Sequence, residues 1–493
     1  MSNVNLVYNV KDKPGLWKTL VFALQQVLAI LAATIVVPVI INGSDEGVAI
    51  GAAMSQSAAL FGAGVGTIIY LLFTKFRSPV FLGSSFAFIG SMCAAFGGAG
   101  AYLCVGYLGL ILGAVFAGLV YVIIAVVVKF VGVKWIDKIM PAAVIGPAVA
   151  VIGLSLAGNA IGDLFKGGLS APITEWVIKN GAPAQVVSFV PVASPWLALL
   201  CGLVTLATVI ICSVYGKKMM KIIPFIIGIL AGYTLAAIFT AIGHIADADA
   251  LKLINFSLFA NMQWLPDFTF VEAFKDLGNV ANFNWGGFIV TVVVAYVPVA
   301  FVVFAEHLAD HKNISSIIGT DLTKDPGLHR TLLGDGVGSM AGAFFGGCPN
   351  TTYGESVGCV AISGNASVVT ILTAAIMCIV AAFFAPFVTL LATIPNCVMG
   401  GVCMALYGFI AVSGLKMIQK VDLSDNRNLF VVSVILIAGV GGMILEIGKV
   451  TITSVACALI LGILANLLCS IKSKKAEAVK EEADKEAAAT ENE

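Results

Sequence analysis

Apolar residues in this chain come in long runs separated by short polar stretches. A helix that crosses a bilayer needs about 20 mainly apolar residues, and fewer where neighbouring protein shelters its backbone. On that criterion we expect about fourteen membrane segments, at 17–42, 48–74, 79–96, 102–128, 139–160, 194–214, 221–243, 286–309, 330–347, 350–363, 366–394, 396–414, 428–445 and 450–470. The third, ninth and tenth segments are short and glycine-rich, and they fit a simple helix poorly. The pattern predicts an all-α polytopic membrane protein.

The composition supports this class. Soluble proteins carry about 25% charged residues, whereas this chain of 493 residues is 59% hydrophobic and 11% charged. Its formal net charge is zero, which gives no support for attraction to nucleic acid. The 11 cysteines lie mostly in apolar segments and form no C-x-x-C pair, so we interpret them as small packing residues rather than metal ligands or disulfides. We expect neither a metal nor a cofactor.

Lys and Arg collect in one set of the loops that fourteen segments would define. Five of the 27 fall in the opposite set, namely Lys166, Lys179, Lys252, Lys275 and Lys449. Cytoplasmic loops are enriched in Lys and Arg, so we expect both termini in the cytoplasm of a cell-membrane protein. Residues 1–16 would form a polar N-terminus and 471–493 a disordered, charged tail. The loops 163–192 and 244–285 would be external.

The two halves of the chain resemble each other. Both MPAAVIGPAVAVIGLSLAG (140–158) and IPNCVMGGVCMALYGFIAVSG (394–414) have a proline five residues before a glycine. Both GSSFAFIG (83–90) and NTTYGESVG (350–358) interrupt their segments with small, polar and aromatic residues. Seven segments per half is an odd number, so we expect 17–243 and 286–470 to form inverted repeats. Paired broken segments in inverted repeats are typical of secondary transporters.

Two acidic residues stand out at membrane depth, Glu306 and Glu355. A buried carboxylate costs several kcal/mol unless it is neutralised, paired or facing water. One interpretation is a structural hydrogen bond between helices. The other is a substrate or proton site, which we favour because both residues are isolated and Glu355 lies on a broken segment.

A small planar ligand suits these carboxyls. A carboxyl group can match the adjacent N–H and C=O groups of a cyclic imide with two parallel hydrogen bonds. Unpaired backbone N–H groups near Gly354 and Glu355 could meet the remaining carbonyls. Phe86, on the other broken segment, could stack on the ring, although a single phenylalanine is more often a packing residue.

Further ionisable residues follow Glu306. Asp310 is four residues away, on the same helical face, and two carboxylates there would repel each other if both were ionised. Asp310 is therefore either a proton carrier or a solvated residue at the helix end. We expect His307 at the cytoplasmic interface, and His311 and His329 in a loop where a surface role is more common than catalysis.

Several motifs resemble a known family. AEH (305–307), TDLTKDPGLHR (320–330), PNTTYGES (349–356) and FLGSSFAF (81–88) resemble uracil permeases of the nucleobase/ascorbate transporter family, and the resemblance runs from about 17 to 470. It implies two inverted seven-segment repeats, with a core domain of segments 1–4 and 8–11 and a gate domain of segments 5–7 and 12–14. It also implies short strands in segments 3 and 10. By the same resemblance, Phe86, Glu306, Gly354 and Glu355 contact uracil, and protons drive the transport.

The chain departs from the family pattern at several positions. Ser356 stands where the family signature has Asn, and Ser363 where it has Thr. Asp310 stands where many uracil permeases have His, and Gln25-Gln26 where the first span has a Gln-His pair. Glu355, rather than Gln, resembles the pyrimidine branch of the family.

We therefore expect a transporter, not an enzyme. It would import uracil with protons, by alternating access at a site between segments 3, 8 and 10, with Glu306 and Asp310 coupling the protons. A xanthine or urate:proton symporter of the same family is the alternative. An anion exchanger is expected to place a cation or bare helix N-termini in its pocket, and a membrane-embedded hydrolase would need catalytic motifs that the sequence lacks. Assembly as a homodimer is left open.

Overall fold

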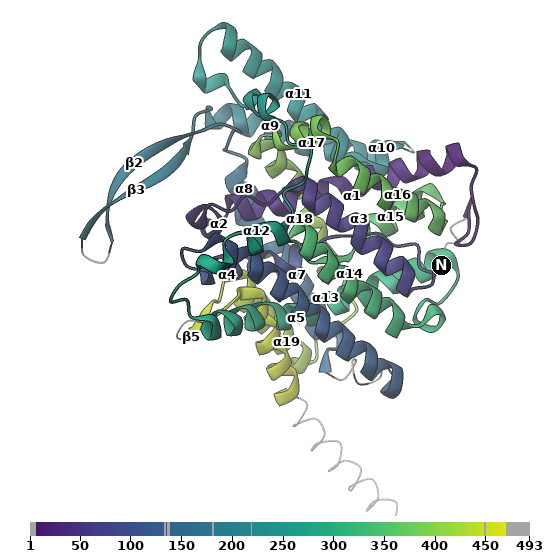
Figure 1. Ribbon diagram of the computed structural model, residues 1–493. Helices are drawn as coiled ribbons and strands as arrows, with labels where there is room; N and C mark the ends of the chain where they lie inside the picture. The colour runs from purple at the N-terminus through teal and green to yellow at the C-terminus, as the bar shows by residue number, and fades with distance from the viewer. Residues whose placement is uncertain are drawn as a thin grey trace, which may run out of the picture.

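Helices dominate the computed structural model, which describes residues 6–132, 135, 139–179, 182–217, 219–447 and 450–469 (Figure 1). Within this part, eight helical stretches are long and apolar enough to cross a membrane. They are α1 (Leu16–Gly43), α3 (Gln56–Phe73), α5 (Leu103–Val131), the pair α7 (Ala142–Ser155) and α8 (Ala157–Asp163), α9 (Pro195–Tyr215), α11 (Pro224–Ile245), α13 (Trp285–Ile318) and α18 (Asn396–Ile418). A ninth results if α16 (Val368–Ala382) and α17 (Ala385–Ala392), which bend by 82°, form one span.

Further helices complete the architecture. They are α2 (Asp45–Ile50), α4 (Ile89–Gly98), α10 (Met219–Ile222), α12 (Thr269–Lys275), α14 (Leu328–Gly346), α15 (Gly354–Ser363), α19 (Asn426–Val440) and a last helix at Ser454–Cys469. Each of the fourteen expected segments contains helix. In the described residues, however, only eight or nine helical stretches are long and apolar enough to cross a membrane. The difference arises because several segments are short or bent, and because α14, although a continuous helix of 19 residues, is too polar to pass.

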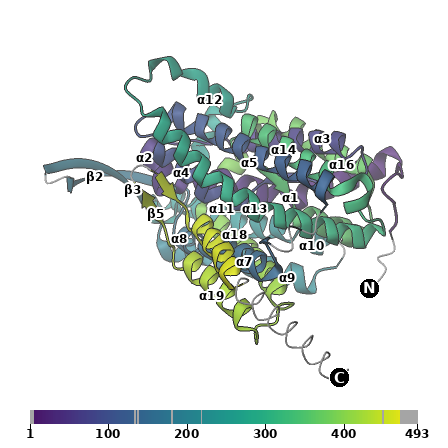
Figure 2. The ribbon, with the colours of Figure 1, turned by 90° about the horizontal axis from the view of Figure 1, so that it is seen from below.

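The helices pack as two groups, which lie side by side in Figure 2. The first helix group comprises α1, α3, α4, α5, α13, α14, α15 and α16, and the second comprises α7, α8, α9, α11, α18 and α19. Glycines let backbones touch within each group. A Cβ added at Gly62 of α3 would lie 2.6 Å from the carbonyl oxygen of Gly342 in α14. One added at Gly414 of α18 would lie 2.3 Å from the backbone nitrogen of Ala150 in α7.

Two short strands from distant parts of the chain pair inside the first helix group. Strand β1 (Leu82–Ser84) is antiparallel to β4 (Asn350–Thr352), with Gly83 opposite Thr351. A 3₁₀ turn, η1 (Phe86–Phe88), follows β1, and α15 follows β4. Because the two strands hydrogen-bond to each other's backbone N–H and C=O groups, both helical stretches can begin in the protein interior.

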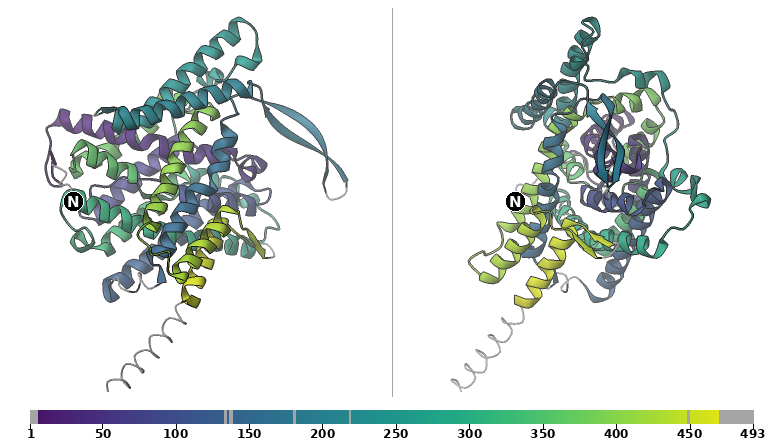
Figure 3. Two further views of the ribbon diagram at one scale, coloured as in Figure 1. Left: turned by 180° about the vertical axis from the view of Figure 1, so that it is seen from behind. Right: turned by 90° about the vertical axis from the view of Figure 1, so that its left-hand side faces the viewer.

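Two other hairpins lie away from this pair. Strand β2 (Ser170–Lys179) pairs with β3 (Ala182–Pro191) in a long hairpin that projects from the helices (Figure 3). Strand β5 (Leu445–Ile447) pairs with β6 (Val450–Ile452) just before the last helix. The loop expected at 244–285 contains α12 and three 3₁₀ turns, η2 (Asp249–Leu251), η3 (Phe256–Asn261) and η4 (Leu277–Asn279).

Two expectations about histidines are wrong. The segment expected to end at 309 continues as α13 to Ile318, so His311 is helical rather than part of a surface loop, and it is fully buried. His307, expected at the cytoplasmic interface, is also fully buried. Helix α13 continues beyond its apolar residues because its C-terminal end packs against protein. His329 lies at the start of α14 and is partly exposed, and the tail 471–493, expected to be disordered, lies outside the described residues.

Candidate substrate-binding site

A cavity of about 480 Å³ lies between the two helix groups. This volume is within the roughly 300–1,000 Å³ of typical small-molecule sites. All five residues singled out from the sequence line it, namely Phe86, Glu306, Asp310, Gly354 and Glu355. They come from η1, α13 and α15, so the cavity joins three segments that are far apart in the chain.

The N-terminus of α15 opens into this cavity. Strand β4 ends at Thr352, Tyr353 precedes the helix in an extended conformation without a side-chain cap, and the helix begins at Gly354. The first N–H groups of a helix have no partner within it, and they carry partial positive charge. Both Gly354 and Glu355 line the cavity, so the start of α15 presents its partial positive charge to a ligand there.

The carboxyl groups differ in their hydrogen bonding. Asp310 is buried and accepts a hydrogen bond from the hydroxyl of Thr352 (3.1 Å). Among the described residues, no side chain donates a hydrogen bond to the carboxyl of Glu306 or Glu355, and both residues are partly buried. Glu306 interacts electrostatically with Glu355 and with Asp310. The site thus concentrates acidic groups, two of which have no side-chain donor among the described residues.

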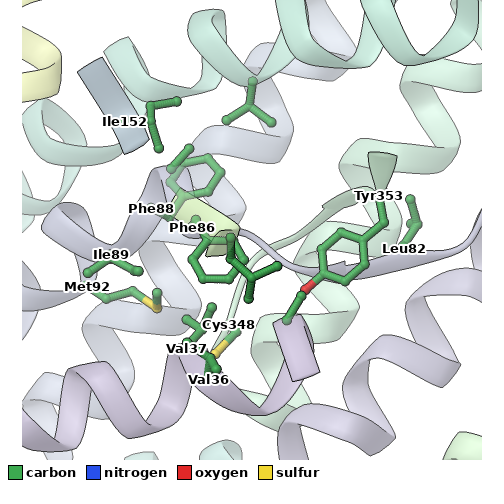
Figure 4. Close-up of a cluster of buried hydrophobic side chains, with 14 of the residues drawn as sticks. Val36, Val37, Leu82, Phe86, Phe88, Ile89, Met92, Ile152, Cys348 and Tyr353 are labelled. Atoms are coloured by element: carbon green, nitrogen blue, oxygen red, sulfur yellow. The ribbon is translucent and has the colours of Figure 1, made fainter. Parts of the chain in front are cut away.

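Phe86 forms part of the wall of the cavity. It is buried, with its ring edge-on to Tyr407 of α18 at a centroid distance of 5.7 Å. Figure 4 shows it among buried apolar side chains that include Val37, Phe88 and Ile89. The aromatic pair connects the first helix group to the second at the level of the carboxyls.

A second cavity, of about 450 Å³, lies beyond this wall. Its polar lining includes Asp45, Glu46 and Asp163 together with Lys166. Three residues line both cavities, namely Phe86, Ala87 and Ile152. A thin apolar layer therefore separates the two cavities.

Sequence reasoning missed the residues that brace the site. The amide of Gln26 in α1 donates to the hydroxyl of Ser356, which also accepts from the backbone N–H of Phe81 (3.1 Å). The hydroxyl of Tyr353 donates to the carbonyl of Ser84 (2.7 Å). Ser356 and Gln26 both occupy positions that depart from the family pattern, and this departure is the feature of the sequence that could have identified them. The second helix group adds apolar residues to the cavity lining, namely Val149, Phe225, Phe409, Ile410 and Met417.

Metal chemistry finds no support in the part of the chain that the structure describes. No group of three His, Cys, Asp or Glu residues there has an arrangement that could hold a metal ion. The site is instead suited to a ligand that offers N–H groups to carboxyls and an aromatic face to Phe86.

Comparisons with known proteins identify the family. Residues 17–448 match the model of the permease family (Xan_ur_permease). The uracil permease of Bacillus caldolyticus is 35% identical over 97% of this chain and 98% of its own length. The uracil permease of Bacillus subtilis (strain 168) is 34% identical over 95% and 96%, and that of Escherichia coli (strain K12) is 32% identical over 94% of both chains.

Solved structures share the fold at low sequence identity. The murine anion transporter Slc26a9 in its inward-facing state aligns with a TM-score of 0.59 and 13% identity, over 94% of this chain and 69% of that one. The transmembrane domain of the cyanobacterial bicarbonate transporter BicA aligns with a TM-score of 0.57 and 16% identity, over 94% and 100%. The match to the permease family model and the identity to the uracil permeases, together with helices long enough to span a bilayer, show that the chain is an integral, multi-pass membrane transporter that belongs to the permease family.

Proposed function

We propose that this permease imports uracil together with protons. The observation that carries the proposal is the meeting of Glu306, Glu355 and Phe86 in one cavity between the two helix groups. Its relatives at 32–35% identity are named uracil permeases, and they match this chain over nearly its whole length.

The chemistry of the cavity matches that of uracil. Each N–H group of the base lies next to a C=O group, so a carboxyl can accept from the N–H and, when protonated, donate to the carbonyl. Glu306 and Glu355 would take these edges, and the N–H groups at the start of α15, around Gly354, would bind a remaining carbonyl. Phe86 would cover one face of the ring, where stacking of a base on an aromatic side chain contributes about 1–3 kcal/mol.

Transport would follow from movement of the two helix groups. In the proposal, the first helix group is the core domain and the second is the gate. Elements at matching places in the two halves pack against each other, β1 with β4 and α7 with α18, which supports inverted repeats. With the orientation expected from the Lys and Arg distribution, the site cavity, which Lys221 and Asn313 also line, faces the cytoplasm. The layer containing Phe86 would then close the site to the outside.

Proton coupling would use Glu306 and Asp310. The two residues share one face of α13, and both line the cavity. A proton that enters with uracil relieves their mutual repulsion while the site is occupied. Import of a neutral base with one proton moves one positive charge inward, and this is driven by about 2.3 kcal/mol for each 100 mV of membrane potential.

The test is uptake of labelled uracil by purified protein in proteoliposomes, with and without an imposed pH gradient. We expect accumulation only with the gradient acid outside, and loss of uracil binding in Glu306→Ala and Glu355→Ala proteins that are folded and inserted. Glu272→Ala, in α12 outside the cavity, is the matched control and should bind uracil normally. Unchanged uracil binding in both site variants would refute the assignment of the binding site. Uptake that is the same with and without the pH gradient would refute coupling to protons.

Competition in the same experiment separates the alternatives. Excess unlabelled xanthine should leave the uptake of labelled uracil unchanged. If xanthine or urate inhibits this uptake more strongly than unlabelled uracil does, the protein would instead be assigned to the purine branch of the family. The described lining does include the uncapped N-terminus of α15 and one basic residue, Lys221. Its three carboxyls, which would repel an anion, nevertheless disfavour anion exchange.

A further inference from the structure

A buried polar cluster lies behind the proposed site, on a second face of α13. Residues 306, 309, 310 and 313 face the cavity, whereas His307 and His311 point into the first helix group and are fully buried. The two imidazole rings stack, with centroids 3.9 Å apart and planes inclined by 24°. The proposed mechanism does not use either histidine.

Hydrogen bonds tie this face of α13 to α14 and α3. His307 Nδ1 lies 2.7 Å from Oδ2 of Asp335, and its Nε2 lies 3.0 Å from the hydroxyl of Thr331, both in α14. His311 Nδ1 lies 2.8 Å from the carbonyl oxygen of His307, and its Nε2 lies 2.6 Å from the hydroxyl of Tyr70 in α3. The cluster fixes the rotation of α13 about its own axis.

The donors and acceptors around His307 locate its protons. The hydroxyl of Thr331 has one hydrogen, which it donates to the carbonyl oxygen of Leu328 (3.0 Å). Toward His307 it must therefore accept, so Nε2 carries a hydrogen. His311 must likewise donate from Nδ1, because its partner there is a carbonyl oxygen. The remaining question is whether the proton between Nδ1 of His307 and Asp335 belongs to the ring or to the acid.

The surroundings of Asp335 answer that question. Its second oxygen, Oδ1, is buried and has no hydrogen-bond partner among the described residues. A full carboxylate there would leave a charged oxygen unsatisfied in the interior, which costs more than an unsatisfied neutral carbonyl. The ionisable groups around the pair are not cationic. They are the ring of Tyr121 in α5, at 6.3 Å from that of His307, the stacked ring of His311, the hydroxyl of Tyr70, and the carboxyls of Glu306 and Asp310. Nothing among them offsets a negative charge.

We propose that Asp335 is protonated and donates a hydrogen bond to Nδ1 of His307, and that this neutral pair positions the carboxyls of Glu306 and Asp310 in the cavity. The proton is retained in the pair and is not the one transported. Asp335 and His307 are positioning residues, because they act through α13 rather than by touching the substrate. The inference rests on the proposed function, since it takes those carboxyls as the substrate site.

Substitution of Asp335 tests this arrangement. The amide of Asp335→Asn can donate to Nδ1 of His307 as the protonated acid does, whereas Asp335→Leu has a similar size and no donor. We expect the Asn variant to keep the uracil Kd and the pH profile of uptake close to those of the unsubstituted protein. The Leu variant should weaken uracil binding about tenfold or more. Asp422→Asn, in an exposed loop, is the matched control and should change neither.

Infrared spectroscopy tests the proton directly. At neutral pH the unsubstituted protein should show the C=O stretch of one protonated carboxyl that is absent from the Asp335→Asn protein and present in Asp422→Asn. An identical carboxylic-acid band in all three proteins would overturn the inference, even if the Leu variant fails to fold. Loss of uracil binding in Asp335→Asn as severe as in Asp335→Leu would also overturn it. Failure of the unsubstituted protein to bind uracil would instead refute the proposed function, while the infrared result would still stand for Asp335.

Discussion

The contact between Gly62 and Gly342 gives a quantitative test of how the first helix group holds the site. Helices α3 and α14 cross here with their backbones in contact. A Cβ at Gly62 would lie 2.6 Å from the carbonyl oxygen of Gly342 and 3.2 Å from its Cα. Ordinary contact begins near 3.4 Å, so Gly62→Ala must separate the two backbones by about 0.8 Å in a densely packed interior.

The cost of that separation can be estimated. Overpacking of this kind costs about 1–3 kcal/mol, whereas Gly→Ala in a helix gains about 1 kcal/mol from propensity. The shift should also reach the site. Asn350 of β4 donates a hydrogen bond to the carbonyl oxygen of Gly62 (2.9 Å), and its amide also lies against Gly342. Separation of the helices therefore displaces β4 and the start of α15, where Glu355 lies.

Thermal unfolding in detergent and uracil binding are the measurements. Gly408→Ala is the matched control, because Gly408 lies inside α18 with no atom within 4 Å of an added Cβ; it shares the gain in propensity without the clash. We expect Gly62→Ala to lower the melting temperature and to weaken uracil binding relative to Gly408→Ala. Equal melting temperatures and equal affinities in the two variants would refute the view that this backbone contact positions β4.

Three further substitutions probe the site. Phe86→Ala should weaken uracil binding by about 1–3 kcal/mol, measured as Kd by titration, whereas Phe86→Tyr should keep most of it; equal Kd values for Phe86→Ala and the unsubstituted protein would exclude stacking. Thr352→Val removes the donor to Asp310 (3.1 Å) and should slow proton-driven uptake, while Thr352→Ser restores it; a normal rate in Thr352→Val would contradict a role for this bond. Ser356→Ala leaves two buried donors without an acceptor, so its melting temperature should fall by the equivalent of about 1–3 kcal/mol, and no change would show that water replaces the hydroxyl.

Much of the candidate site could be found in the sequence. Charged residues are so costly within a bilayer that Glu306 and Glu355 stand out in apolar or broken segments without any structural information. Gly354 and Phe86 came from the same broken segments, where irregular backbone implies a cavity or a protein interior. The structure places all of these residues, with Asp310, around one cavity.

The histidines show where sequence reasoning fails. His307 and His311 follow the last apolar residues of their segment, and polar residues there normally mark the membrane surface. In the structure they are fully buried, since α13 continues to Ile318 and their rings hydrogen-bond to side chains of α14 and α3. Their partners, Asp335 and Tyr70, lie 28 and 241 residues from them in the chain, so local pattern could not pair them.

The sequence by itself determined the class of protein, the family and the acidic residues of the candidate site, but not the number of spans. These follow from free energies of transfer and from motifs, which are properties of single segments. Only the tertiary structure decided which side of each helix meets protein, that β1 pairs with β4, and that Phe86 and Ile152 separate two cavities. The physical reason is that lipid and a protein interior are both apolar. A hydrophobic run therefore shows that a segment leaves water but not what it packs against.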